Sequence, residues 1–561
     1  MMKAAEAAVS VLMEQGAKYV FGIPGGQTLY FTDALREAGI SFVQTRHEGV
    51  AAGAADAYGR LTGKPGLCLA TTGPGATNLL TSIGGALRDS SPLIAFVFQN
   101  TLAGAGRGDA QEADHELLFG SLVKKYIPVR HGDAVVWAMR EAYRVAMTGR
   151  PGPVVVDFYR DVIEKGECDY VPEKVERYCA PMEFAPTQTQ IAELADKLSG
   201  YEKVAVWCGN GVKMSHCGDK ALRLAERIGA PVVTTFNGIG SVPTEHPQVF
   251  GARTRHGTHL TKEILETADC VLVLGSSMSS VSTNRWGLKL KDVIQVDFAP
   301  EQIGKQYPVA YPVVGQLNLV LDALCGALGE GKPKPAAKAW LTDLQQRFAE
   351  WMQNVYAGPV NDEKATPAAP VALMRKLNEC FLDDSIICVD AGNPGAWSHL
   401  FHLTASNRYF KPVNYGNMGF SIPAGIGASM AQPDKDVLCF IGDGSLGMTL
   451  GDLETVARFT RHMTVVVLND HAYGNIKQEE LFKFGEGHYY GVDLYRPADY
   501  AAVAKAFGLG AEKVSSAEEI VDAIKRARAH DGSYLIEVEF DGSYSIWPEA
   551  FLWNEKTQAR R

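Results

Sequence analysis

Short runs of consecutive apolar residues alternate with segments of helical periodicity through most of the chain. Uninterrupted Val, Ile and Leu runs indicate strands that are covered on both faces, as in parallel sheets. Such runs predict buried strands at 19–23, 66–70, 93–98, 154–158, 204–207, 271–274, 293–296, 386–389, 437–441, 465–468 and 535–538. This alternation predicts an α/β fold of three doubly wound domains with parallel sheets.

Two stretches without a strand pattern divide the chain. Residues 167–186 carry scattered charge and three prolines, and residues 329–370 hold the stretch GEGKPKPAAK and then a helical pattern. Punctuation by Pro, Gly and Lys is typical of domain boundaries. We therefore expect domains at residues 1–170, 187–328 and 366–561.

A quasi-repeat links the first expected domain to the third. Segments 49–60 and 66–81 run parallel to segments 419–431 and 437–450. In both copies a helix of small residues leads to a buried strand, a Gly-x-Gly loop and a further helix. One interpretation is that the similarity only reflects the common pattern of βαβ units. The other is two homologous domains that face each other across one site.

Composition narrows the class of protein. The chain has 561 residues, of which 46% are hydrophobic and 21% charged, as in folded globular proteins rather than disordered or fibrous ones. Its formal net charge of −10 argues against nucleic acid as the main partner.

The ten cysteines form no CxxC pair, which fits a reducing compartment. No run approaches the ~20 apolar residues of a membrane span, and the N-terminus lacks a signal-peptide core, so we expect a cytoplasmic protein without membrane partners.

Two acidic residues stand at the carboxyl ends of neighbouring predicted strands. Asp443 lies in the turn Gly442–Asp443–Gly444–Ser445, and Asp470 follows the next strand, 27 residues later. Ligands of open α/β sheets bind at this edge, and a glycine-flanked turn before a helix presents N–H groups to a phosphate. Carboxylate oxygens are the ligands that Mg²⁺ prefers. A metal-bridged diphosphate is one interpretation, and a simple tight turn after a strand is the other.

With these motifs the chain resembles the thiamin-diphosphate enzymes of the acetolactate synthase, pyruvate oxidase and 2-oxo acid decarboxylase type. Their diphosphate motif is GDG followed further on by an asparagine pair, which here is Asn469–Asp470. The resemblance implies thiamin diphosphate and Mg²⁺ as cofactors, with Asp443, Asp470 and the carbonyl of Ala472 as metal ligands. Asp470 departs from the family's Asn but keeps an oxygen ligand.

The resemblance extends over nearly the whole chain. It implies an N-terminal pyrimidine-binding domain, a central domain and a C-terminal domain for the diphosphate and the metal. The matching segments are FGIPGGQ (21–27), RHEGVAAGAADAYGR (46–60), TTGPGATN (71–78), RPGPVVVDFYRDV (150–162), PVVTTFNGIGSVPTEHP (231–247), ADCVLVLGS (268–276), DAGN (390–393) and GNMGFSIPAGIGA (416–428).

The resemblance also assigns roles at the cofactor. Glu48 is the carboxyl group that activates the aminopyrimidine, Met418 separates the two cofactor rings, and the Gly416 carbonyl accepts from the pyrimidine amino group. Asn393 approaches the diphosphate. Considered alone, Glu48 is a helix-start carboxylate, Met418 a core residue and Asn393 a turn residue. The other cofactor positions implied are Pro24, Pro74, Asn78, Gly444, Ser445, Tyr473 and Gly474.

In this family the cofactor bridges the first domain of one subunit and the third of another. Glu48 and Asp443 of one site would then belong to different chains. The expected assembly is a homodimer or a dimer of dimers (a homotetramer) with active sites between subunits.

The resemblance implies a substrate pocket with three departures from acetolactate synthase. Its positions are Gly26, Gln27, Gln111, Arg160, Ile476 and Glu479, with Ala110 and Asn475 beside them. Ala110 replaces Phe, Arg160 replaces Lys and Glu479 replaces a Trp, so we expect a different substrate. Gln111 is the residue that handles substrate oxygens, or else a solvated loop amide. Arg160 is an anion partner, or more ordinarily a surface residue beside Asp161.

The implied function is a thiamin-diphosphate- and Mg²⁺-dependent carboligase, decarboxylase or lyase. It would make or break a C–C bond next to the carbonyl of a small 2-oxo acid, aldehyde or 2-hydroxy compound. The alternatives are a flavin-linked 2-oxo acid oxidase of the same fold and an acyl-CoA-handling lyase. RHGTH (255–259) matches part of the family's flavin site, but 275–287 lacks the charged segment found there. We therefore expect no FAD, with a nucleotide such as ADP as an alternative occupant of the central domain.

Overall fold

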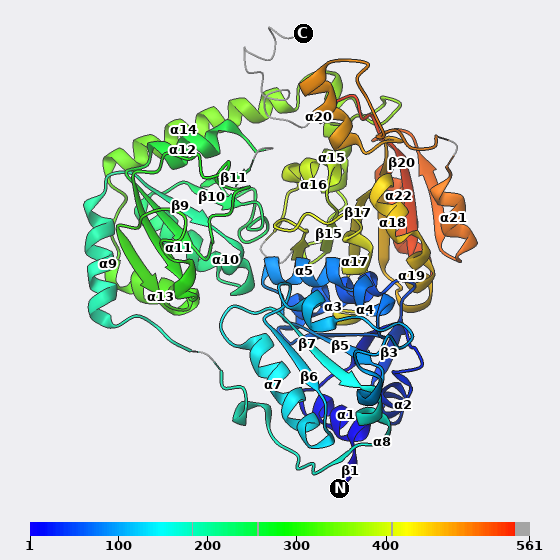
Figure 1. Cartoon of the computed structure of the whole chain (residues 1–561). Coiled ribbons are helices and arrows are strands. Elements are labelled where there is room, and N and C mark those ends of the chain that lie inside the picture. Colours follow the sequence, from blue (N-terminus) through cyan, green and yellow to red (C-terminus); the bar gives the residue numbers. More distant parts are fainter. Residues whose placement is uncertain (182, 255–256, 405–407, 497, 545–561) are drawn as a thin grey trace.

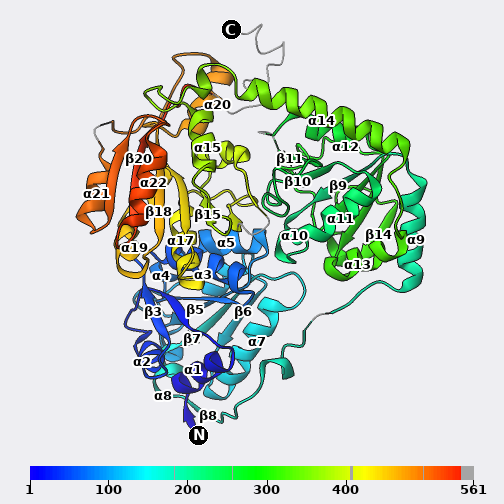
Figure 2. The ribbon, with the colours of Figure 1, turned by 180° about the vertical axis from the view of Figure 1, so that it is seen from behind.

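Three six-stranded parallel sheets form the framework of the chain, which confirms the predicted α/β fold class. The computed structural model describes all residues except 182, 255–256, 405–407, 497 and 545–561. The N-terminal domain lies at one end of the molecule, and the central and C-terminal domains lie side by side above it (Figure 1). The helix α14 (Pro335–Val355) runs across the top between these two domains, as the view from behind also shows (Figure 2).

In spatial order, the N-terminal sheet consists of β3 (Ser41–Gln44), β2 (Tyr19–Gly22), β4 (Gly66–Ala70), β5 (Leu93–Gln99), β7 (Pro153–Tyr159) and β6 (Lys125–Val129). The central sheet consists of β11 (Val249–Arg253), β10 (Val232–Thr235), β9 (Val204–Cys208), β12 (Cys270–Leu274), β13 (Asp292–Asp297) and β14 (Tyr311–Val314). The C-terminal sheet consists of β16 (Arg408–Phe410), β15 (Ile386–Val389), β17 (Val437–Gly442), β18 (Met463–Asn469), β20 (Tyr534–Glu539) and β19 (Gly510–Val514). A short antiparallel pair joins β1 (Met2–Lys3) to β8 (Glu167–Cys168).

Helices connect the strands of each sheet. The N-terminal domain contains α1 (Ala4–Glu14), α2 (Leu29–Glu37), α3 (Glu48–Thr62), α4 (Pro74–Asn78), α5 (Leu80–Asp89), α6 (His115–Phe119), α7 (Val135–Met147) and α8 (Arg160–Lys165). The central domain contains α9 (Gln188–Gly200), α10 (Asn210–Met214), α11 (Gly218–Ile228), α12 (His259–Thr267) and α13 (Leu317–Leu328). The C-terminal domain contains α15 (Pro370–Asn378), α16 (Asn393–Trp397), α17 (Ser421–Ala431), α18 (Asp443–Thr449), α19 (Leu453–Phe459), α20 (Gly474–Phe484), α21 (Tyr500–Ala506) and α22 (Ile520–Ala529).

The N-terminal and C-terminal sheets have the same topology. Numbered along the chain within each sheet, the strands of both lie in the order 2-1-3-4-6-5. The quasi-repeat in the sequence therefore corresponds to two domains of one architecture. The central sheet has the different order 3-2-1-4-5-6, which is that of dinucleotide-binding domains.

All the strands predicted from apolar runs are present, with ends that differ by at most two residues. The strands that the pattern missed are β10, the short β1 and β8, and the six at sheet edges, namely β3, β6, β11, β14, β16 and β19. Edge strands such as β3 and β14 contain both buried and exposed residues, since an edge strand has a neighbouring strand on one side only. The expected domain boundaries remain predictions.

The N-terminal and C-terminal domains share one hydrophobic core along α3 and α17. Glycines let the two helix backbones approach closely. A Cβ at Gly53 would lie 2.7 Å from the Pro423 ring, and one at Gly427 would lie 2.1 Å from the Ala54 carbonyl oxygen. Larger residues at either glycine would force the two domains apart.

A single buried carboxylate joins all three domains. Asp89, at the end of α5, accepts hydrogen bonds from Asn237 of the central domain at 3.2 Å and from Asn414 of the C-terminal domain at 2.8 Å. Its other oxygen lies 3.5 Å from the Arg60 guanidinium of α3. Burial raises the pKa of Asp89, and Arg60 opposes that rise.

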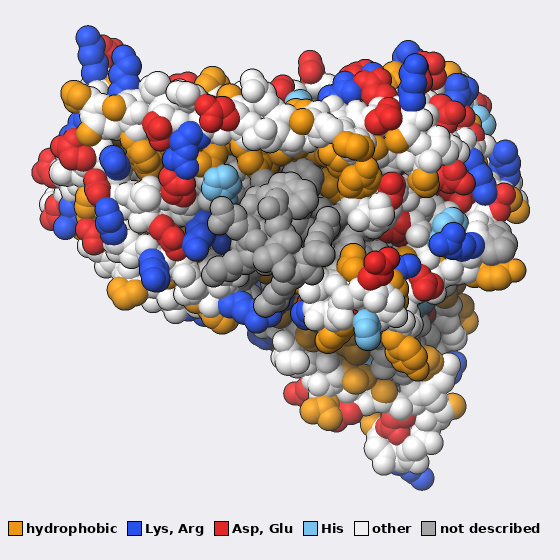
Figure 3. Space-filling model, turned by 90° about the horizontal axis from the view of Figure 1, so that it is seen from above, with side chains coloured by type: hydrophobic (Ala, Val, Ile, Leu, Met, Phe, Trp, Pro, Cys, Tyr) orange, Lys and Arg blue, Asp and Glu red, His pale blue; other side chains and the backbone are white. Residues whose placement is uncertain are grey.

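The surface carries charges of both signs. On the face seen from above, acidic and basic side chains are interspersed (Figure 3). In the described part of the chain, every helix is too short or too polar to span a bilayer.

We predict that Asp89→Ala loosens the contact between the domains. The change removes the side-chain partner of Asn237, one of the two acceptors of Asn414 and part of the compensation of the Arg60 charge, at a cost of about 2–4 kcal/mol. Differential scanning calorimetry should show a lower melting temperature. Asp33→Ala, which breaks only an exposed ion pair with Arg36, should leave it unchanged. Equal melting of the wild type and Asp89→Ala would contradict the proposed joint.

Candidate active site

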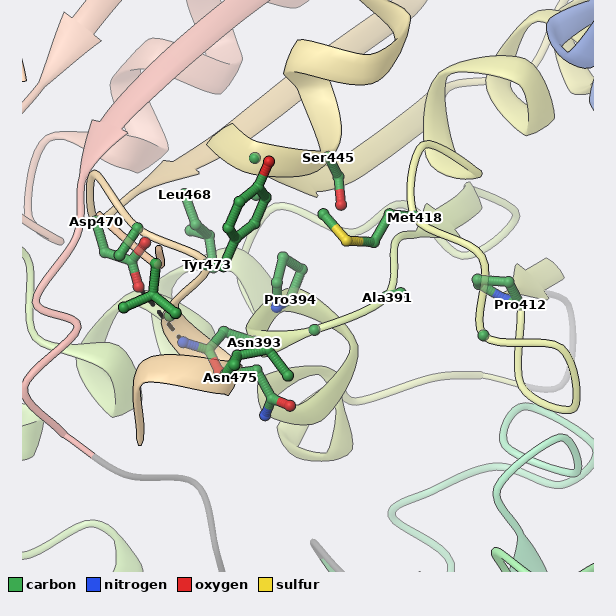
Figure 4. A pocket seen from close by; sticks show the side chains of 18 of the residues that line it. Ala391, Asn393, Pro394, Pro412, Met418, Ser445, Leu468, Asp470, Tyr473 and Asn475 are labelled. Carbon is green, nitrogen blue, oxygen red and sulfur yellow. Dashed lines mark hydrogen bonds between the residues drawn. The ribbon is translucent and has the colours of Figure 1, made fainter. Parts of the chain in front are cut away.

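A large cavity of about 820 Å³ lies between the carboxyl ends of the C-terminal and central sheets. Loops after β15, β16, β17 and β18 line one side, and Phe236 and the 280–285 loop of the central domain line the other. The predicted residues that it brings together are Asn393, Gly416, Met418, Asp443, Gly444, Ser445, Asp470, Ala472, Tyr473, Gly474 and Ile476. Asp470 lies on one side of Tyr473 and Asn393, and Met418 lies on the other (Figure 4).

Two buried carboxylates dominate the electrostatics of this cavity. Asp443 is the first residue of α18 and is 2% exposed, and Asp470 follows β18. Burial and the negative charge of Asp470 raise the pKa of Asp443 to about 7. Burial raises the pKa of Asp470 to about 6. A bound cation would relieve the repulsion and hold both groups ionised.

The backbone around Asp470 is shaped for a close approach. A Cβ at Gly474 would lie 2.0 Å from Asp470 Oδ2, so a larger residue here would displace the Asp470 carboxylate. Asn393 Nδ2 donates to the same Oδ2 at 3.5 Å. Asn393 Oδ1 and Asp443 Oδ2 are buried without a hydrogen-bond partner among the described residues.

These unpaired oxygens fit a hard divalent cation. Mg²⁺ usually takes one or two carboxylates and completes its octahedral shell with phosphate oxygens and waters. Asp443, Asp470 and the carbonyl of Ala472 are the candidate ligands, and the helix N-terminus of α18 is suited to a phosphate. The described residues contain no cluster of three or more His, Cys, Asp or Glu that could hold a metal by themselves.

Asp390 holds the loop that carries Gly416 and Met418. This carboxylate is fully buried after β15 and accepts from the backbone N–H groups of Gly419 at 3.0 Å and Ser421 at 2.7 Å. Asp390 is part of the segment DAGN, for which only Asn393 was predicted to have a role. The position of Asp390 next to this motif is the one feature of the sequence that points to it.

The predicted residues of the N-terminal domain lie elsewhere in the chain. None of the described residues that line the large cavity comes from this domain. Glu48 is the first residue of α3, is 8% exposed, and accepts from Asn78 Nδ2 at 2.9 Å through Oε2. A Cβ at Gly75 would lie 3.3 Å from Oε1, so the Pro74–Asn78 helix α4 packs directly over the Glu48 carboxylate.

Asn100, which sequence analysis missed, connects the predicted substrate residues of this domain. It follows β5, accepts from Gln27 Nε2 at 3.1 Å and donates to the Ala110 carbonyl at 2.7 Å. Its own carbonyl accepts from the Arg160 N–H. Gln27, beside Gly26 and Pro24 after β2, also accepts from Thr71 at 2.7 Å.

Two predicted substrate residues form ion pairs on their own helices. Arg160 Nε lies 2.5 Å from Glu164, and Glu479 lies 2.6 Å from Lys483. Glu479 is absent from the described lining of the large cavity, where Glu480 takes part instead. Their assignment to substrate binding remains a prediction.

A buried chain of hydrogen bonds fixes the turn that faces Glu48 and Gln111. The Gly73 N–H donates to His115 Nε2 at 3.2 Å, and His115 Nδ1 lies 3.0 Å from Asp157 Oδ2. The Tyr126 hydroxyl donates to the same oxygen. Since Nε2 of His115 accepts a hydrogen bond, its Nδ1 must carry the ring proton. Nδ1–H therefore donates to Asp157 Oδ2. These hydrogen bonds were not predicted, because the residues that form them lie far apart in the sequence.

The turn itself is conformationally constrained. Gly73 has φ +57°, and a Cβ there would lie 2.1 Å from the Gln111 carbonyl oxygen. Gln111 has φ +63°, and its carbonyl accepts from the Thr72 hydroxyl at 3.4 Å. His115 is therefore a positioning residue for both Gln111 and the α4 helix over Glu48.

The central sheet has only a small cavity beside β9 and β12, the two strands between which the strand order reverses. The cavity there, beside Asn210, Gly275 and Asp297, is about 70 Å³, whereas ligand pockets usually exceed ~300 Å³. A Cβ at Gly209 would lie 2.2 Å from the Gly275 carbonyl oxygen, so the two loops are in contact. Residues 255–256 of the RHGTH segment lie outside the described residues, and the absence of FAD remains a prediction.

Family models match three segments of the chain. Residues 2–118 match the thiamine pyrophosphate enzyme, N-terminal TPP binding domain, and residues 390–538 match the C-terminal TPP binding domain. Residues 191–324 match the thiamine pyrophosphate enzyme, central domain.

Relatives align over nearly the whole length. A probable acetolactate synthase large subunit of Methanocaldococcus jannaschii is 31% identical over 97% of this chain and 93% of its own length. The acetolactate synthase isozyme 3 large subunit of Escherichia coli is 29% identical over 100% of this chain and 99% of its own. An acetolactate synthase of Mycobacterium bovis is 31% identical over 99% of this chain and 91% of its own.

We predict that His115→Leu disorders the turn at Gly73. The change leaves the Gly73 N–H without an acceptor and removes one donor to buried Asp157, which costs about 2–3 kcal/mol. Hydrogen exchange of residues 71–78 should accelerate.

The double variant His115→Leu with Asp157→Asn separates stability from positioning. Removing the buried charge should restore much of the melting temperature while exchange of residues 71–78 stays fast. His115→Gln, whose Oε1 can accept from Gly73, should exchange slowly. Slow exchange in His115→Leu would show that the turn does not depend on His115.

Proposed function

Because the chain belongs to the thiamine pyrophosphate enzyme family, we propose that it is a carboligase of the acetolactate synthase type. It depends on thiamin diphosphate and Mg²⁺ and acts on small 2-oxo acids. In the proposed reaction, one 2-oxo acid loses CO₂, and the remaining fragment forms a new C–C bond to the carbonyl carbon of a second substrate. This class of reaction is supported by the relatives that align over nearly the whole chain, since they are named as acetolactate synthase large subunits.

The observation that carries the proposal is the single cavity holding two buried carboxylates, the Met418 loop and the N-terminus of α18. Asp443, Asp470 and the Ala472 carbonyl would hold the metal, and the N–H groups of Gly444 and Ser445 would receive the diphosphate. When bound, thiamin diphosphate supplies the nucleophilic carbon and accepts the electron pair released with CO₂.

Glu48 would hold and move the proton at the cofactor's pyrimidine nitrogen. Its Oε2 is occupied by Asn78, so Oε1 is the atom free for this bond. A carboxyl group that already accepts one hydrogen bond has a fixed orientation, which favours proton transfer along one line. Gln111, held by the Gly73 turn, would bind the oxygen of the substrate carbonyl.

The separation of Glu48 from the large cavity supports a site shared by two copies of the chain. We infer a homodimer or dimer of dimers in which the N-terminal domain of one copy completes the cavity of another. Ala110, Arg160 and Glu479 further suggest a substrate larger or more polar than that of acetolactate synthase.

Turnover of a panel of 2-oxo acids, pyruvate among them, tests the proposed reaction. With thiamin diphosphate and Mg²⁺, the protein should release one CO₂ for every two molecules of its 2-oxo acid substrate and form one hydroxy-oxo acid that contains the remaining carbons of both, detectable by NMR. Chelation of the metal should abolish turnover, and added Mg²⁺ should restore it. Hydrogen peroxide as a product would favour the oxidase alternative. CO₂ without ligation would indicate a simple decarboxylase, and no CO₂ from any 2-oxo acid would overturn the proposal.

A further inference from the structure

A buried glutamate lies on β20, beside the strand β18 that leads into the Asp470 turn. Glu537 is 2% exposed and lies on the same face of β20 as Leu535, which belongs to the apolar core. Glu537 is not among the described residues that line the large cavity. A carboxylate in such a place is costly unless hydrogen bonds compensate for its lost hydration. Its hydrogen-bond partners therefore indicate what it does.

Both oxygens of Glu537 accept hydrogen bonds. Oε2 accepts from the backbone N–H of Ala501, in the first turn of α21, at 2.9 Å and lies 3.7 Å from Lys513 Nζ of β19. Oε1 accepts from Asn469 Nδ2 at 2.7 Å. Surrounded by these donors, the carboxylate acts only as an acceptor. The amide of Asn469 must therefore turn its Nδ2, and not its Oδ1, towards Glu537.

This orientation of Asn469 reaches the turn that holds the candidate metal ligands. Its Oδ1 accepts from the His471 N–H at 3.2 Å. His471 has φ +55°, in the left-handed region that residues with a side chain seldom adopt. Asp470 and Ala472 flank this residue. The hydrogen bond to Asn469 therefore stabilises the backbone conformation that sets the directions of the Asp470 side chain and the Ala472 carbonyl.

The segment 492–494 holds the second half of the same turn through its backbone. The His471 carbonyl accepts from this segment at 2.7 Å, and the Tyr473 N–H donates to it at 2.8 Å. These bonds leave the His471 N–H to Asn469. The pair of Glu537 and Asn469 thus supports the first half of the turn, which the backbone bonds do not reach.

We infer that Glu537 is a positioning residue for the metal site. It fixes the amide orientation of Asn469, which in turn holds the backbone at His471. This conformation aims Asp470 and the Ala472 carbonyl at the metal. The inference rests on the proposed function and adds to its metal site a residue outside the cavity. Replacing residues that orient metal ligands weakens metal binding by about 10- to 100-fold in metalloproteins.

Glu537→Gln tests this role because it exchanges one carboxylate oxygen for an NH₂ group. The remaining oxygen should stay with the two donors Ala501 N–H and Lys513, so that the NH₂ group faces Asn469. The Asn469 amide then turns over and presents its own NH₂ group to the His471 N–H. The hydrogen bond that stabilises the turn is lost without a change in side-chain size.

Binding of Mn²⁺ in the presence of thiamin diphosphate, followed by EPR, is the main readout and needs no turnover. Glu537→Gln should bind Mn²⁺ about tenfold or more weakly than the wild type. Glu539→Gln is the matched control, because Glu539 is exposed on the same strand and the change in charge is identical. It should bind Mn²⁺ as the wild type does.

A double variant, Asn469→Asp with Glu537→Gln, should restore the hydrogen bonds. The carboxylate at position 469 can accept both from the new amide at 537 and from the His471 N–H. Most of the Mn²⁺ affinity should return. Hydrogen exchange of residues 470–473, fast in Glu537→Gln, should become slow again, which an added charge near the metal would not by itself produce.

The outcomes separate positioning from a purely structural role. Unchanged Mn²⁺ affinity in Glu537→Gln would overturn the inference, and a lower melting temperature with unchanged affinity would assign Glu537 to the stability of α21 alone. If Glu537→Gln does not fold, the double variant decides, and a folded double variant with weak Mn²⁺ binding would contradict the inference.

Failure of the proposed function is distinguishable from failure of the inference. A wild type that binds no Mn²⁺ with thiamin diphosphate would overturn both. A wild type that binds Mn²⁺ but turns over no 2-oxo acid would overturn the proposed reaction only, and the Mn²⁺ affinities of the variants would still decide the role of Glu537.

Discussion

The mutual repulsion of two buried carboxylates is the constraint on which the candidate site depends. Asp443 and Asp470 are taken out of water at the ends of adjacent strands, and burial raises the pKa of both. Such a pair is stable as two anions only with a cation between or beside them. The close contact of Gly474 with Asp470 and the unpaired Asn393 and Asp443 oxygens are compatible with such a cation.

The domain arrangement separates this site from the carboxylate expected to activate the cofactor. Within one chain, α3 packs along α17 and Asp89 ties all three domains together, so Glu48 is held apart from the cavity that contains Asp443. The close contacts at Gly53 and Gly427 leave no room for the domains to slide. A second copy of the chain is therefore the simplest way to bring both halves of the site together.

The sequence predicted the interior of each sheet but not most of its edges. Strands such as β5 and β17 are runs of apolar residues because both faces are covered, whereas the edge strands β3 and β14 have only four residues each and include exposed positions. For the site, residues within compact motifs, such as Asp443 and Met418, were predicted to lie together and do. The connecting residues Asn100 and His115 were not predicted, because their partners are distant in the sequence and their local surroundings carry no pattern.

A subunit complementation measurement tests the central claim most directly. Glu48→Gln and Asp443→Asn chains, carrying different tags, are co-expressed and the mixed dimer is purified through both tags. If the site is shared between chains, each variant alone is inactive and the mixed dimer, with one intact site of two, has about half of the wild-type activity. If Glu48 and Asp443 of one chain form the site, the mixed dimer has no intact site. An inactive mixed dimer that binds thiamin diphosphate and retains the wild-type melting temperature would contradict the account.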